Sequence, residues 1–168
     1  YFELRRLLRD RGDVDRAEFK RRFSNHYRLH TGGLTEGFKK RYFELLFAFK
    51  IPYGDADPYT PLLLELYKLP RRQGKQALQA SFVSKLVAIH DESRPIYDVH
   101  VSRFFGMGPP ALGSVRFRIA GFVANLQRIR ERYDQWSDDP RVTFHGRFRD
   151  VDESLFVVRA GNSHCRAE

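Results

Sequence analysis

The chain has 168 residues, of which 42% are hydrophobic and 14% aromatic, which is enough apolar side chain to fill one core. Its formal net charge is +9, and residues 1–50 hold thirteen Lys and Arg against seven Asp and Glu. No run of eighteen apolar residues occurs, which excludes a membrane-spanning helix. We expect a single helical domain over residues 1–168.

A strongly basic chain is typical of proteins that bind polyanions, because neutralised phosphates release their counterions. A charged surface that serves solubility alone is the alternative interpretation. The single cysteine, Cys165, cannot form an internal disulfide, and we expect a cytoplasmic monomer. The start at Tyr1 lacks the pattern of a signal peptide, which we interpret as trimming or disorder at this end.

The sequence of residues 1–68 predicts several helices, each with apolar residues along one face. A short first helix is followed by a second that places Phe19, Phe23 and Tyr27 four residues apart. Thr35 is placed to cap a third helix. The inner face of that third helix consists of large apolar side chains at helical spacing: Phe38, Tyr42, Leu45 and Phe49. Prolines and glycine then predict a loop before a compact fourth helix.

Helical spacing returns from about Lys75 to His90, at Leu78, Phe82, Leu86 and Ile89. Asp98 is placed to cap a short helix, and Ser114 to cap the longest helix, over residues 114–136. That helix carries an apolar stripe at steps of three and four: Val115, Ile119, Phe122, Leu126, Ile129, Tyr133 and Trp136. Such a stripe favours a core helix over a coiled-coil seam. We therefore predict an all-α, compact multi-helix bundle, with a short irregular or strand segment within residues 140–168.

One segment, residues 69–105, has an arrangement that suggests chemistry. It begins Leu69-Pro70-Arg71-Arg72-Gln73-Gly74-Lys75, continues as a helix, and reaches Pro95-Ile96-Tyr97-Asp98-Val99-His100-Val101-Ser102-Arg103. Here the chain resembles the helix-hairpin-helix DNA glycosylase superfamily, which includes the 8-oxoguanine glycosylases. In that family a Leu-Pro hairpin and a lysine at a helix start precede an Asp-x-His-Val element, which Asp98-Val99-His100-Val101 matches.

The resemblance implies a base-excision repair protein that flips a damaged base out of duplex DNA and removes it. Asp98 is then the catalytic carboxylate, and Lys75 or Lys85 the amine that attacks the sugar. This chemistry needs an anionic group near the deoxyribose and, in a bifunctional enzyme, a partly deprotonated amine. We slightly favour Lys75, which begins the expected helix as the family's lysine does. Lys85 lies within that helix and faces either a groove or the edge of the core.

The same resemblance implies DNA contacts from the hairpin and the short helix, at Arg71, Arg72, Gln73, Gly74, Tyr97, His100 and Arg103. The family hairpin normally reads Gly-x-Gly, which lets backbone amides approach a phosphate, whereas this tip has Gly74 alone. The arginines would then hold the phosphate by charge. With Tyr53 and Tyr59, Tyr97 is expected among the exposed aromatics, and it is our candidate for stacking on a base.

Two other interpretations stay open. A non-catalytic helical nucleic-acid-binding module would keep the scaffold and the charge without turnover. His90 and Asp91, with His26 and Asp98 as further ligands, suggest a helical metal-dependent phosphohydrolase. His26 and His30 stand four residues apart on one expected helix face, but they lack an obvious third ligand. The chain also lacks the four cysteines of an iron-sulfur cluster, and we expect no metal and no cofactor.

Overall fold

The computed structural model describes residues 2–9, 13–30, 33–52, 56–72, 74, 76–108 and 113–137. Within these residues all regular structure is helical and no strand occurs, which confirms the predicted all-α class. The helices are α1 (Phe2–Arg9), α2 (Asp13–His26), α3 (Glu36–Ala48), α4 (Tyr59–Tyr67), α5 (Ala80–His90), α6 (Val99–Phe104) and α7 (Val115–Ser137). The segment expected after residue 140 and Cys165 lie outside the described residues. Of the described helices, none is long and apolar enough to cross a membrane.

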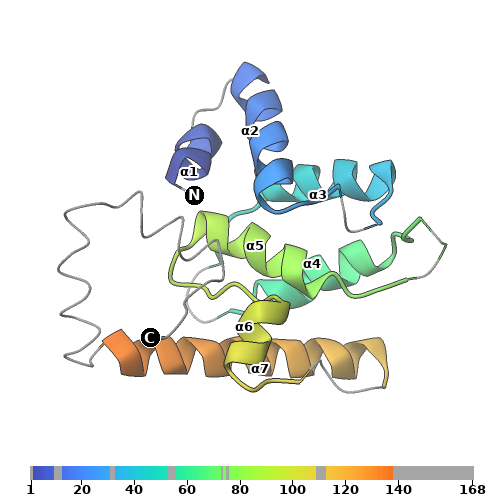
Figure 1. The fold of residues 1–168 in the computed structure, drawn as a ribbon. Coiled ribbons are helices and arrows are strands. Elements are labelled where there is room, and N and C mark those ends of the chain that lie inside the picture. Colours follow the sequence, from blue (N-terminus) through green and yellow to red (C-terminus); the bar gives the residue numbers. More distant parts are fainter. Residues whose placement is uncertain are drawn as a thin grey trace.

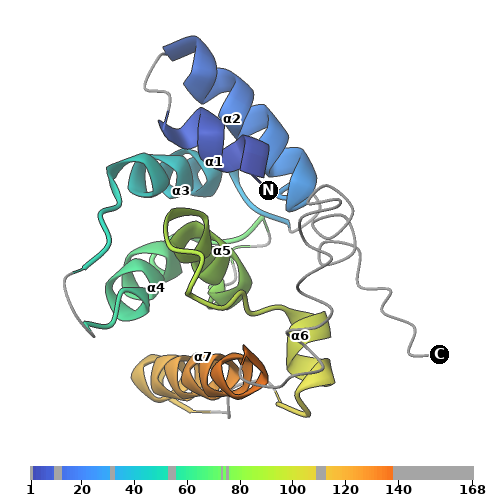
Figure 2. The same ribbon diagram turned by 90° about the vertical axis from the view of Figure 1, so that its left-hand side faces the viewer.

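The helices are arranged in tiers (Figures 1 and 2). The pair α1 and α2 lies at one end, above α3. Helices α4 and α5 lie in the middle. Helix α7 runs across the opposite end, with α6 beside it. α1 packs on α2, and α4 packs on α3, α5 and α7.

Aromatic and branched aliphatic side chains fill the space between the tiers. Burying such a side chain fully contributes roughly 1.5–3 kcal/mol relative to leaving it exposed. Thr35 caps α3 as predicted, because its hydroxyl accepts a hydrogen bond from Phe38 N at 3.2 Å. The fully buried side chains of greatest volume come from α2 to α5, α7 and the loop before α3: Phe19, Phe23, Leu29, Leu34, Phe38, Tyr42, Leu46, Leu63, Leu66, Leu86, Ile89 and Phe122.

The stripe of α7 is buried in its first part only. Ile119, Phe122, Leu126 and Ile129 are buried as predicted, whereas Tyr133 is 41% and Trp136 is 36% exposed. The prediction of a core role for these two residues was therefore wrong, because α7 extends past the packed middle tier. Their rings instead contact Phe105, with centroids 5.8 and 5.4 Å away.

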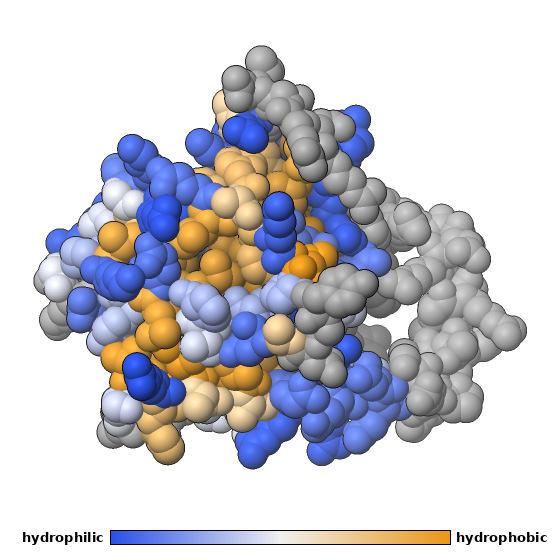
Figure 3. All heavy atoms as spheres, turned by 180° about the vertical axis from the view of Figure 1, so that it is seen from behind, coloured by the Kyte–Doolittle hydropathy of each residue, from blue (hydrophilic) through white to orange (hydrophobic). Residues whose placement is uncertain are grey.

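Several large apolar side chains reach the surface among the described residues. Phe104 is 71% and Phe117 is 60% exposed. Seen from behind, hydrophobic residues form a broad area in the middle of the molecule, flanked by hydrophilic ones (Figure 3).

Candidate active site

A buried serine connects α5 to the segment that leads into α6. Ser84 Oγ accepts a hydrogen bond from Tyr97 N at 2.9 Å, and it can donate to Tyr97 O at 3.2 Å or to Ser81 O at 3.0 Å. Buried backbone groups must find partners, so this link fixes where the two segments meet. Lys85 and Asp98 each follow a linked residue directly, and the charge of Asp98 acts on the pKa of the Lys85 amine.

Asp98 is fixed in position by its role at the start of α6. Its backbone is extended, and its Oδ1 accepts hydrogen bonds from His100 N and Val101 N, both at 2.9 Å. Two amides at a helix start have no intrahelical partner, so an aspartate cap satisfies both of them. The predicted cap is confirmed, and it holds the half-buried carboxylate in one orientation.

Lys85 is a half-buried lysine with aromatic and hydroxyl neighbours. Its Nζ donates a hydrogen bond to Ser81 Oγ at 2.9 Å and lies 5.3 Å from the ring centroid of Tyr27 and 5.7 Å from that of Phe82. Burial lowers the pKa of this amine below its ordinary value of 10.5, although the charge of Asp98 acts in the opposite direction. Burial is therefore the larger effect, and the neutral amine forms more readily than on an exposed lysine.

Two further titratable side chains, His26 and Tyr133, respond to the charges of Lys85 and Asp98. We call these four residues the Lys85–Asp98 cluster. Partial burial lowers the pKa of His26, and the nearby positive charge of Lys85 contributes to that change. Partial burial raises the pKa of Tyr133, and the charge of Asp98 adds to the rise. The charge of Lys85 thus acts on His26 of α2, and the charge of Asp98 acts on Lys85 of α5 and on Tyr133 of α7.

A hollow of about 330 Å³ lies next to this cluster, between α1 and α2. It is lined by Glu3, Leu4, Arg22, Asn25 and His26. Lys85 and Asp98 are not among its lining residues. The ring of His26 contacts the ring of Tyr27, at a centroid distance of 4.6 Å, and Tyr27 in turn contacts Lys85. A short series of side chains thus connects the hollow to the amine.

The basic hairpin is anchored to the loop before α3. Arg72 N donates to Gly33 O at 3.0 Å, and Thr35 Oγ1 donates to Pro70 O at 3.3 Å, which docks the hairpin on the loop before α3. Gly74 has a φ of +71°, a left-handed conformation that suits glycine, and its N–H donates to Arg71 O at 2.9 Å. Arg71 and Arg72 are exposed.

The expected helix start at Lys75 is wrong. α5 begins at Ala80, and residues 76–79 are not helical. Lys75 itself and Gln73 lie outside the described residues. Lys85 is described, and the charge of Asp98 acts on the pKa of its amine.

The expected exposure of Tyr97 is also wrong. Tyr97 is only 8% exposed, and its ring packs edge-on against Phe122 with centroids 5.2 Å apart, so it is not available to stack on a base. Tyr59 is likewise buried, and Tyr53 lies outside the described residues. His100 and Arg103 are exposed on α6, as a DNA contact requires.

The histidines and acids of the phosphohydrolase hypothesis do not assemble into a metal site. His90 Nε2 lies 2.9 Å from Leu46 O, and Asp91 accepts hydrogen bonds from Ser93 and Arg94. His30 lies in a turn after α2, which ends at His26, so the expected helical pair does not form. Among the described residues, no group of three or more potential metal ligands occurs.

Two residues that position or contact Lys85 and Asp98 were missed by the sequence reasoning. Ser84 is the clearest case, because a serine between Val83 and Leu86 on the apolar side of a helix needs a hydrogen-bond partner. The position of Ser84 on the apolar side of the helix was therefore a signal in the sequence for a buried hydrogen bond. Tyr27 was predicted as core alone, and its contact with Lys85 depends on how α2 and α5 pack.

The arrangement combines an amine whose pKa burial lowers with a carboxylate held in a fixed orientation. Such a pair can attack an electrophilic carbon and accept the proton that the amine releases. Comparison with models of protein families, with curated proteins and with solved structures finds no match for this chain. A functional proposal therefore depends on the chemistry of the site.

Proposed function

We propose that this chain is a DNA glycosylase-like protein, with Lys85 as nucleophile and Asp98 as the assisting carboxylate. The observation that carries the proposal is the half-buried Lys85 amine, which lies over the rings of Tyr27 and Phe82 and donates to Ser81. Burial lowers the pKa of this amine, and the charge of the capping carboxylate of Asp98 acts on it. Schiff-base lysines require this combination, because an ordinary exposed lysine is almost fully protonated at neutral pH. The proposal retains the expected chemistry and assigns the amine to the lysine beside Asp98.

The proposed reaction begins at the Lys85 amine. The neutral Lys85 Nζ attacks C1′ of an extruded deoxynucleotide, and the bond from C1′ to the base breaks with its electron pair leaving on the base. The base takes a proton from solvent, and Asp98 accepts the proton that the amine releases. Opening of the sugar ring then gives a Schiff base, which water hydrolyses. In a monofunctional variant of this scheme, Asp98 orients the attacking water instead.

Charge and exposure support DNA as the partner. The net charge of +9 favours binding to a polyanion. Arg72 and Arg103 are exposed, and they lie on either side of α5 in the chain, on the hairpin before it and the short helix after it. We propose that such side chains contact backbone phosphates while the damaged base is extruded.

Base release from duplexes that each carry one lesion tests the proposal. Wild-type protein should release at least one kind of damaged base, and Asp98→Asn should slow release about 100-fold or more while DNA affinity stays the same. Glu44→Gln, which changes an exposed carboxylate on α3, is the matched control and should behave as wild type. Intact DNA binding with no release from any lesion would instead indicate a non-catalytic nucleic-acid-binding module.

A further inference from the structure

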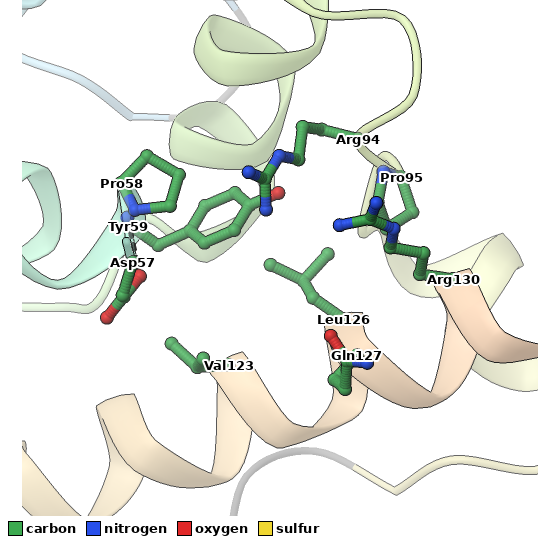
Figure 4. Close-up of a pocket in the computed structure, with 9 residues that line it drawn as sticks. All are labelled: Asp57, Pro58, Tyr59, Arg94, Pro95, Val123, Leu126, Gln127 and Arg130. Atoms are coloured by element: carbon green, nitrogen blue, oxygen red, sulfur yellow. Dashed lines mark hydrogen bonds between the residues drawn. The ribbon is translucent and has the colours of Figure 1, made fainter. Parts of the chain in front are cut away.

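A small cavity lies between α4, α7 and the segment before α6, and neither Lys85 nor Asp98 lines it. Its volume is about 90 Å³, several times the roughly 10–15 Å³ that one water molecule needs. Its walls include Pro58, Pro95, Val123 and Leu126, which are apolar. Figure 4 shows the Tyr59 hydroxyl and the guanidinium groups of Arg94 and Arg130 gathered at one side of it.

The Tyr59 hydroxyl is a buried donor without an acceptor. The residue is 4% exposed, and among the described residues its oxygen has no hydrogen-bond partner. Burial raises the pKa of Tyr59 to about 12, so the hydroxyl keeps its proton at neutral pH. An unsatisfied hydroxyl in such a place costs free energy, and an oxygen atom of a ligand would remove that cost.

Two arginines supply positive charge beside this hydroxyl. The side chain of Arg94 is only 15% exposed, and its Nε contacts Asp91 Oδ2 at 3.2 Å. The guanidinium of Arg130 is not hydrogen-bonded or ion-paired to any of the residues that the structure describes. Like charges that approach each other repel, especially where burial reduces screening. An anion between the two guanidinium groups would be attracted by both of them.

The carboxylates nearby do not fill that role. Asp57 Oδ1 accepts hydrogen bonds from the backbone N–H groups of Tyr59 and Thr60, at 2.8 and 3.3 Å, and its Oδ2 accepts one from the Thr60 hydroxyl. Figure 4 shows the Asp57 carboxylate pointing away from the two guanidinium groups. Asp91 contacts the Nε edge of Arg94 and leaves the other guanidinium nitrogens for a ligand.

We propose that this cavity binds one phosphate group, held by Arg94, Arg130 and the Tyr59 hydroxyl. Planar guanidinium groups match the geometry of phosphate oxygens, and a protonated hydroxyl adds a third donor. The site is separate from the Lys85–Asp98 cluster and does not depend on glycosylase activity.

Calorimetric titration of the protein with inorganic phosphate, at constant ionic strength, tests the site. Wild-type protein should bind one phosphate, and Arg130→Gln should weaken binding about tenfold or more, because a hydrogen bond to a charged group is lost. Arg128→Gln, an exposed arginine on the same helix, is the matched control and should leave the affinity unchanged. Equal affinities of Arg130→Gln and Arg128→Gln, or no saturable binding by wild type, would overturn the proposal.

Tyr59→Phe provides a test that does not rely on a charge change. The ring keeps its edge-on contact with Phe122, at a centroid distance of 5.9 Å, so the variant should fold. Without phosphate it should melt at a higher temperature than wild type, because the unsatisfied hydroxyl is gone. Added phosphate should then raise its melting temperature less than that of wild type. An equal phosphate-induced rise in both proteins would contradict the assignment of Tyr59.

The phosphate group can belong to a DNA backbone or to a free ion, and a second titration separates these sources. Binding of a short undamaged duplex is measured for wild type and for Arg130→Gln. Weaker duplex binding by Arg130→Gln, together with competition by inorganic phosphate in wild type, assigns the site to a backbone phosphate. Unchanged duplex binding, with phosphate affinity still reduced, assigns it to a free phosphate.

Discussion

Ser84 Oγ accepts a hydrogen bond from Tyr97 N at 2.9 Å and thereby ties the middle of α5 to the residue before Asp98. Both linked residues are buried, and each is followed directly by a member of the proposed catalytic pair. This bond spans thirteen residues of sequence. The position of Lys85 relative to Asp98 therefore depends on one serine hydroxyl.

Ser84→Ala should lower the free energy of unfolding by about 1–3 kcal/mol, because the buried N–H of Tyr97 loses its acceptor. Urea denaturation measures this change. Ser102→Ala is the control, since Ser102 is also buried but its hydroxyl bonds within α6, to Val99 O at 3.1 Å. An equal or larger loss in Ser102→Ala would show that the Ser84 link has no special role.

Substitutions of Asp98 should separate stability from activity. Asparagine keeps an oxygen that accepts from His100 N and Val101 N, so Asp98→Asn should unfold at nearly the same denaturant concentration as wild type. Asp98→Ala removes the cap and should cost about 1 kcal/mol. Base release should fall in both variants. Full activity in Asp98→Asn would remove the carboxylate from the mechanism.

The lowered pKa of Lys85 makes part of the stability depend on pH. Below the folded-state pKa, the amine is charged in both states, and the folded protein bears the cost of a partly buried charge. As pH rises from that pKa to the unfolded value of about 10.5, this cost disappears and stability from this residue increases. Lys85→Met should lack this increase. Parallel urea titrations of both proteins over this pH range would show the unfolding free energy of wild type rising relative to that of Lys85→Met.

One outcome of the same titration would contradict the predicted pH dependence. If the difference in unfolding free energy between wild type and Lys85→Met stays constant over that range, the amine titrates alike in both states. Burial by Tyr27 and Phe82 would then not affect its charge. Lys20→Met is a useful control, because the Lys20 amine also lies over aromatic rings but its side chain is exposed.

The exposed arginines of the hairpin and α6 should determine how DNA affinity depends on salt. Each phosphate contact that is lost should reduce the slope of log affinity against log salt by about 0.9. Arg72→Gln and Arg103→Gln should each show this reduction, and Lys40→Gln, an exposed lysine on α3, should not. Fluorescence anisotropy over a series of salt concentrations measures the slope. Identical slopes in all three variants would exclude the two arginines as phosphate contacts.

Local features of the fold were predictable from the sequence. The three predicted helix caps form, because a backbone amide in the first turn of each helix donates to the side-chain oxygen of Thr35, Asp98 or Ser114. A cap needs only its own next three residues, so a local pattern is sufficient. The start of α5 was not predictable in the same way, because Leu78 continues the apolar spacing although it lies before the helix begins at Ala80.

The proposed active site was predictable only in part. Asp98 was found from its motif, but its proximity to Lys85 requires the Ser84–Tyr97 bond, which no local pattern contains. Tyr97 is buried because α7 supplies Phe122 as a packing partner from a distant part of the chain. Contacts of this kind arise from tertiary packing, and they decide which polar side chains meet.

Borohydride trapping is the most direct test of the central claim, that the Lys85 amine is the nucleophile. The protein is incubated with duplex DNA that contains an oxidised base or an abasic site, reduced with borohydride, digested and analysed by mass spectrometry. We predict a covalent adduct on the peptide that contains Lys85, absent in Lys85→Met and present in Lys20→Met. An adduct on Lys75, or an equal yield of adduct in Lys85→Met, would contradict the account.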